Sequence, residues 1–111
     1  MKTIFDCETE IGICEPDWAP DADPRNGSGS DPWKVFIHTK AALTHAKGMM
    51  KVEHRCLVRS GDEISDHPDV KPDMILEPAP DTEKETLVLA EQFHRTFIDR
   101  ARQTIGNGCV A

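Results

Sequence analysis

One pair of side chains has residue types and a spacing that could support catalysis. Asp6 and Glu8 lie two residues apart on a segment whose alternation predicts a strand, so both carboxylates would project from the same face. Carboxylates placed in this way can hold divalent metal ions that activate water and steady a leaving oxygen.

The stretch Phe5–Thr9 resembles the first motif of the DEDD-family 3′–5′ exonucleases, in which an Asp-x-Glu pair on an early strand binds two metals. The spacing from His94 to Asp99 is similar to that family's last motif, which implies a base at His94 and a further metal ligand at Asp99. The resemblance implies a metal-dependent exonuclease that uses Asp6 and Glu8. Its middle carboxylate would come from one of four candidates: Asp62, Asp66, Asp69 and Asp73.

Soft ligands suggest a second kind of site, a structural zinc. The candidate ligands are Cys7, Cys14, His54 and Cys56, although no close Cys-x2-Cys pair is present. No local signature selects a Cys–His pair for nucleophilic catalysis. Since we expect a cytoplasmic protein, we expect all four cysteines to be reduced thiols, with no bound metal or cofactor.

Charge is distributed unevenly along this 111-residue chain, whose net charge is −7. Residues 1–24 hold seven acids and one base, whereas residues 25–60 hold two acids and seven bases. Residues 61–85 are acidic again, with nine acids and two bases. Folding could gather the acids into one negative surface, which would attract a basic protein surface and repel nucleic acid.

The charge pattern favours a small, non-enzymatic interaction protein, an inhibitor or accessory subunit that docks on a basic surface such as a nucleic-acid-binding groove. Trp18, alone in a Pro-rich segment, could anchor such a partner. The residues predicted to bind the partner are Asp6, Glu8, Glu10, Asp17, Trp18, Asp21 and Asp23. The exonuclease and the zinc protein are the alternatives.

Composition excludes several classes of protein. Overall acidity argues against direct nucleic-acid binding by the basic middle of the chain. No run of about 18 apolar residues is present, so no membrane span is expected. An acid at position 6 interrupts the apolar stretch that a secretion signal needs, which favours the cytoplasm.

Periodicity and turn residues predict the elements that would position these residues. Thr82 and Glu85 form a capping box at the start of a long amphipathic helix, which Gly106 would end. Four prolines mark each of two expected loops. In chain order we expect a strand in 1–14, a loop at 15–32, a strand at 33–38, a short helix at 39–47, a strand at 50–59, a loop at 61–81 and a helix at 82–105.

These elements predict a single domain of the α+β class, spanning residues 1–111. A small, mostly antiparallel sheet of about three strands would carry the long C-terminal helix on one face. Phe5, Phe36, Phe93 and Phe97 should be the largest pieces of its core. A homodimer stays open as an alternative if part of the helix's apolar arc is uncovered.

Overall fold

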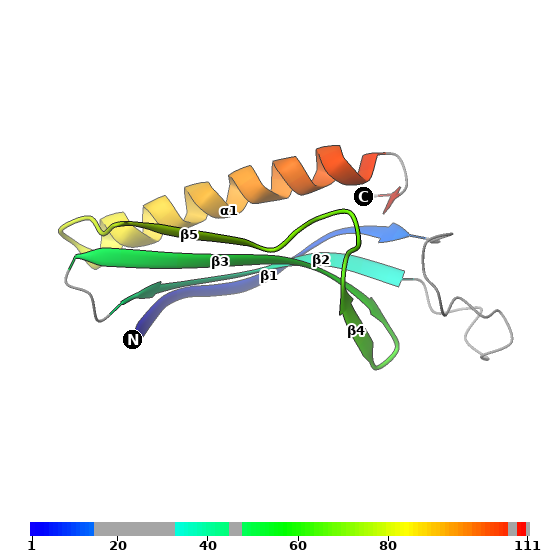
Figure 1. The fold of residues 1–111 in the computed structure, drawn as a ribbon, viewed down its shortest axis with the longest axis horizontal. Coiled ribbons are helices and arrows are strands. Elements are labelled where there is room, and N and C mark those ends of the chain that lie inside the picture. The colour runs from blue at the N-terminus through cyan, green and yellow to red at the C-terminus, as the bar shows by residue number, and fades with distance from the viewer. Residues whose placement is uncertain (15–32, 45–47, 107–108, 111) are drawn as a thin grey trace, which may run out of the picture.

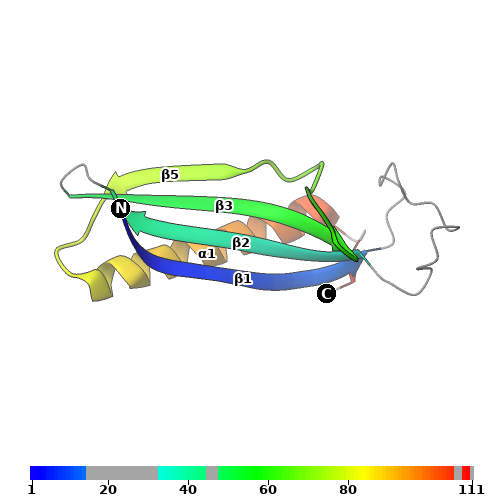
Figure 2. The ribbon, with the colours of Figure 1, turned by 90° about the horizontal axis from the view of Figure 1, so that it is seen from below.

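The computed structural model describes residues 1–14, 33–44 and 48–106 in full and residues 109–110 by their backbone. It has two layers, an antiparallel sheet and one long helix that crosses a single face of the sheet (Figure 1). We call this the helix face. The other is the open face, which carries no helix among the described residues (Figure 2). The α+β class predicted from the sequence is confirmed.

Three long strands form the body of the sheet, β1 (Lys2–Cys14), β2 (Trp33–Leu43) and β3 (Met49–Ser60). They lie in the order β3-β2-β1, and each pairs antiparallel with its neighbour over nearly its whole length. Along β2 and β3, residues buried under the helix alternate with residues on the open face. Period-two burial of this kind is what a sheet covered on one side requires.

Three shorter strands extend the sheet. β4 (Glu63–Asp66) and β5 (Asp73–Pro78) pair with successive stretches of β3, on the side away from β2. Gly61 has a φ of +59° in the two-residue turn between β3 and β4, a conformation that glycine adopts at little cost. β6 (Cys109–Val110) pairs with the last two residues of β1.

The helix α1 (Glu83–Ile105) begins and ends as its sequence predicts. The side chain of Thr82 accepts a hydrogen bond from the Glu85 amide at 3.1 Å, and Gly106 ends the helix with a φ of +63°. The helix buries mainly one stripe against the sheet. None of the described helical residues form a segment that is long and apolar enough to cross a membrane.

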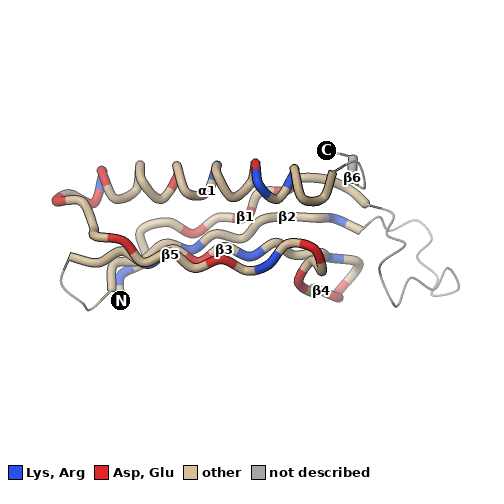
Figure 3. Tube along the Cα trace, turned by 45° about the horizontal axis from the view of Figure 1, so that its top comes forward, with Lys and Arg blue, Asp and Glu red and all other residues tan. Residues whose placement is uncertain are grey.

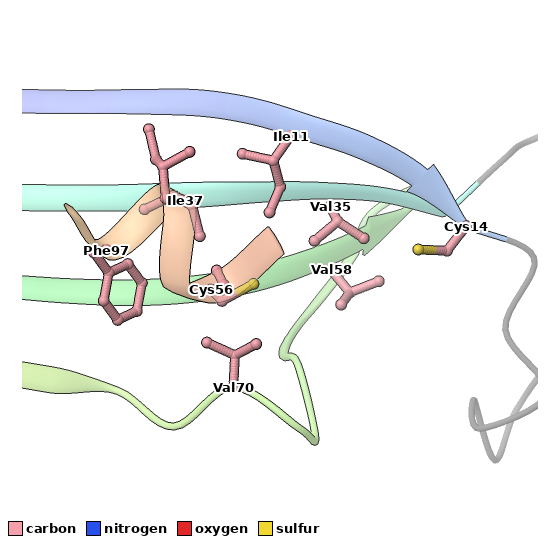
Figure 4. Close-up of a cluster of buried hydrophobic side chains, with 10 residues drawn as sticks. Ile11, Cys14, Val35, Ile37, Cys56, Val58, Val70 and Phe97 are labelled. Atoms are coloured by element: carbon pink, nitrogen blue, oxygen red, sulfur yellow. The ribbon is translucent and has the colours of Figure 1, made fainter. Parts of the chain in front are cut away.

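Two hydrophobic clusters lie between the sheet and α1. The larger cluster, near the C-terminal end of α1, is centred on Ile37, Val58 and Phe97 (Figure 4). The smaller one contains Met50 and Ala90. Of the four phenylalanines, Phe97 is the most buried, whereas Phe36 is buried on the open face beneath the guanidinium of Arg59.

The sequence prediction of about three strands and a short helix is wrong in two segments. Residues 39–43, predicted as the start of a helix, continue β2 because they pair with β1 on one side and β3 on the other. These two ladders outweigh the helix preference of alanine. The expected loop at 61–81 contains β4 and β5, and its prolines at 72 and 78 stand just before and at the end of an edge strand, where proline is tolerated. The expected loop at 15–32 lies outside the described residues.

A bulge in β1 changes which side chains face the core. The register with β2 shifts between Glu10 and Gly12, so Ile13 turns outward and Cys14 turns inward. Without the bulge, strict alternation would place Ile13 on the same face as Ile11, which is buried. Cys14 is disulfide-bonded, so the expectation that all four cysteines are reduced is wrong; Cys7 and Cys56 are free thiols.

Candidate functional site

A row of polar side chains crosses the helix face of the sheet. The register aligns Cys7 on β1, Thr39 on β2, His54 on β3 and Asp73 on β5. We call these four residues the polar row. The adjacent row on one side contains Ile37 and Cys56, and that on the other contains Ala41 and Val52. The polar row therefore separates the two hydrophobic clusters.

His94 projects from α1 onto the polar row and hydrogen-bonds to one threonine of β1 and one threonine of β2. Its Nδ1 lies 2.6 Å from the Thr39 hydroxyl, and its Nε2 lies 2.9 Å from the Thr9 hydroxyl. Burial lowers the pKa of His94, with the charge of Arg95 acting in the same direction and Glu91 opposing it. A neutral imidazole has one donor and one acceptor nitrogen, and a hydroxyl can complement either. This histidine is thus held neutral in a fixed orientation.

Cys7 and His94 form the arrangement closest to a catalytic dyad, with 3.5 Å between Sγ and Nε2. The electrostatics oppose nucleophilic use of the thiol. Burial raises the pKa of Cys7, and Asp6, Glu8 and Glu91 raise it further, against one lowering hydrogen bond from Thr9. The thiolate is the nucleophilic form of cysteine, and a raised pKa disfavours it. The Cys7–His94 pair is therefore better suited to a structural contact than to nucleophilic catalysis.

We therefore expect Cys7 to react slowly with iodoacetamide at pH 7.5, several-fold more slowly than the same thiol in the urea-unfolded protein. Cys56 should be slower still, because burial raises its pKa to about 12. Time-resolved mass spectrometry of the two cysteine peptides gives both rates. A Cys7 that reacts faster in the folded protein than in the unfolded one would show an activated thiol and contradict this interpretation.

His54, at the centre of the polar row, is 1% exposed and stacks on the ring of Phe97 with 4.7 Å between ring centroids. Neither ring nitrogen has a hydrogen-bond partner among the described residues, since Asp73 Oδ2 is 3.9 Å from Nδ1. Burial lowers the pKa of His54 to about 4; the Asp73 carboxylate opposes the shift, and His94 and Arg100 add to it. The ring is neutral at physiological pH.

The acids Asp6, Glu8 and Glu10 project from β1 on the open face, and all three are exposed. We call them the acidic stripe. On the neighbouring strand, Lys40 lies opposite Asp6, and His38 Nε2 is 3.0 Å from an Asp6 carboxylate oxygen. On the same face the register places Lys40 of β2 beside Glu53 of β3, which pairs with Lys51, and Arg55 of β3 pairs with Asp66 of β4. The trace in Figure 3 marks lysine and arginine along β2 and β3 and acids at β4. The open face therefore carries charges of both signs.

The structure does not assemble the residues that the exonuclease resemblance implies. Asp6 and Glu8 project from the open face, whereas His94 lies between the sheet and α1. Asp99 is exposed on the helix. The candidates for the middle carboxylate do not lie together either. Asp66 forms an ion pair with Arg55 on the open face, whereas Asp73 lies in the polar row on the helix face. The body of the sheet thus separates the metal-ligand pair from the proposed base.

The candidate zinc ligands are likewise divided. Cys14 is committed to a disulfide, and Cys7 contacts His94. Within the described parts of the chain, no three His, Cys, Asp or Glu side chains are grouped so that they could hold a metal ion.

Four predicted partner-binding residues, Asp17, Trp18, Asp21 and Asp23, lie outside the described residues. Conversely, the sequence interpretation missed Thr9 and Thr39 as partners of His94. The available signal for Thr9 was alternation along β1, which puts it on the same face as Cys7 and opposite to the exposed acids, where a polar side chain needs a hydrogen-bond partner. Thr39 was missed because its segment was assigned to a helix.

Comparison with known proteins does not assign this chain to a family. Comparison of the chain with protein-family models, with curated proteins and with solved structures gave no significant match. The candidate functions below accordingly depend on the geometry and charge of this molecule.

Proposed function

We propose that this protein is a non-catalytic binding protein that docks on a basic surface of another protein. The observation that carries the proposal is the acidic stripe, three exposed carboxylates of one strand on a sheet face that no helix covers among the described residues. The partner would be a protein with a positively charged groove, and this chain would act as its inhibitor or its accessory subunit. The acids at positions 17, 21 and 23, with Trp18, are proposed to extend the same contact.

The chemistry of the helix face supports binding over catalysis. Cys7 is held as a thiol, His94 is held by two threonines, and His54 is enclosed in the core. Catalytic groups need access to a substrate and a pKa suited to proton transfer. The exposed charges, in contrast, are those that speed and orient the encounter of two proteins.

Reversing the acidic stripe should abolish partner binding without unfolding the protein. In the variant Asp6→Lys/Glu8→Lys/Glu10→Lys, three attractive contacts become repulsive, so we expect at least about tenfold weaker binding. The partner is first captured from the source lysate with the tagged wild-type protein at low salt and released at high salt. Its dissociation constant is then measured for each variant by calorimetry.

The matched control is Asp62→Lys/Glu63→Lys/Glu77→Lys, which changes the net charge by the same amount. These three acids are exposed and form no ion pair with another described residue. The control should keep the wild-type affinity, and circular dichroism should show both variants folded. Equal affinity of the stripe variant and the control would contradict the role of Asp6, Glu8 and Glu10.

A further inference from the structure

One border of the sheet is a strand edge that is largely unpaired within the part of the chain that the structure describes. β1 pairs with β2 on one side from Lys2 to Cys14, but on its other side β6 covers only Ile13 and Cys14. Among the described residues, Lys2–Gly12 therefore has no strand on its outer side, and Figure 2 shows β1 along the border of the sheet. In an antiparallel ladder, the outward N–H and C=O groups of such a strand are free to pair with another chain.

We propose that this edge of β1 binds an extended segment of a partner protein as an added strand, and that the segment carries lysine or arginine at alternate positions. The inference rests on the proposed function and deepens it, because it specifies how the partner binds. Main-chain hydrogen bonds to β1 would align the segment, and the acidic stripe would select its side chains.

The charge requirement follows from the strand that already pairs with β1. On the inner side of β1, Lys40 lies directly opposite Asp6, and His38 lies opposite Glu8. Opposite charges at facing positions of adjacent strands stabilise a sheet. Glu10 lies opposite Phe36 and meets no base on that side. A strand added on the outer side would meet all three carboxylates, so lysine or arginine at alternate positions is the complementary pattern.

The regular part of β1 sets the length of the segment. Register shifts interrupt the ladder between Thr3 and Phe5 and between Glu10 and Gly12. The uninterrupted stretch is Phe5–Glu10, which contains the whole acidic stripe. Bulges limit regular pairing beyond themselves, so the bound segment would span about six residues.

Charge also distinguishes this occupant from a second copy of the chain. If two β1 edges paired with each other, acidic stripes would face one another across the new ladder. Like charges at facing positions destabilise strand pairing. The edge is therefore matched to a basic strand of another protein.

The test uses a synthetic nine-residue peptide in which lysine alternates with valine or threonine, titrated into the full-length protein by calorimetry. A second peptide has the same composition with its lysines grouped together. Two further peptides carry N-methyl groups on alternate amides, one on the odd positions and one on the even positions. Backbone methylation removes hydrogen-bond donors without changing charge, and only one of the two sets faces β1 in an added strand.

We expect the alternating peptide to bind and the grouped peptide to bind about tenfold more weakly. Methylation of one set should weaken binding to the same extent, and methylation of the other set should not. Hydrogen exchange should slow at alternate amides of Phe5–Glu10 when the peptide binds. The stripe variant should lose binding, while the control variant Asp62→Lys/Glu63→Lys/Glu77→Lys should retain it.

Two results would overturn the inference. If all four peptides bind equally, the acidic stripe attracts positive charge without strand addition, and the proposed function survives alone. If the alternating peptide does not bind, β1 does not accept a basic strand. Capture of the partner by the wild-type protein, and its loss in the stripe variant, test the proposed function separately.

Discussion

Replacing His54 by phenylalanine should make the free energy of unfolding less dependent on pH in the acid range, by the equivalent of about one proton bound on unfolding. The wild-type ring is neutral in the folded state with a pKa of about 4, compared with 6.5 for an unperturbed histidine. The unfolded chain therefore binds this proton at a higher pH than the folded chain. The stability that depends on a neutral His54 is fully present above pH 6.5 and is lost as the pH falls towards 4.

The expected size of this effect makes it measurable. A difference of this size between folded and unfolded pKa values corresponds to a loss of about 3 kcal/mol of unfolding free energy once the pH has fallen below both. Phenylalanine preserves the aromatic stack on Phe97 and removes two buried nitrogens that lack hydrogen-bond partners. The variant should consequently be at least as stable as the wild type at pH 7.

Urea unfolding at pH 7, 6, 5 and 4 tests this directly. The wild type should lose stability more steeply than His54→Phe between pH 6.5 and 4. Thr96→Val is the control, because Thr96 is exposed on α1 and its replacement removes no titratable group. The control should keep the wild-type slope. If His54→Phe and the wild type have parallel pH profiles, burial of a neutral His54 does not govern the acid sensitivity.

The elements that the sequence predicted are those with local signals. The boundaries of α1 depend on Thr82, Glu85 and Gly106, whose effects act within a turn of the helix. The exposed acids of β1 followed from alternation alone. β4 and β5 lacked such a signal, because both are short strands that depend on pairing with β3.

The polar row could not be predicted for a related reason. Cys7, Thr39, His54 and Asp73 come from four strands, and only the register between the strands places them side by side. Register depends on turns and on the bulges of β1, which change the phase of the side chains. A histidine on a helix surface does not indicate which hydroxyls will meet it. The sequence therefore identified individual core-face residues without identifying the site they form.

Replacing His94 by leucine should destabilise the protein by about 2–3 kcal/mol, because the buried hydroxyl of Thr39 and the partly buried hydroxyl of Thr9 would lose their hydrogen bonds to the ring. Thr39→Val should cost about 1–2 kcal/mol, since it leaves Nδ1 of His94 unpaired. These costs arise from buried polar atoms that cannot reach water.

The double variant Thr39→Val/His94→Leu should cost less than the sum of the single variants. It replaces both partners of the 2.6 Å hydrogen bond by apolar groups, so neither is left unsatisfied. Urea unfolding at pH 7 of the four proteins gives the coupling free energy, which should exceed about 0.5 kcal/mol. Thr96→Val, at an exposed helix position, is the control and should change stability by no more than about 0.5 kcal/mol. Additive costs for Thr39 and His94 would mean that the hydrogen bond between them does not hold α1 to the sheet. The coupling, in contrast, would identify His94 as a residue that fixes the helix over the polar row.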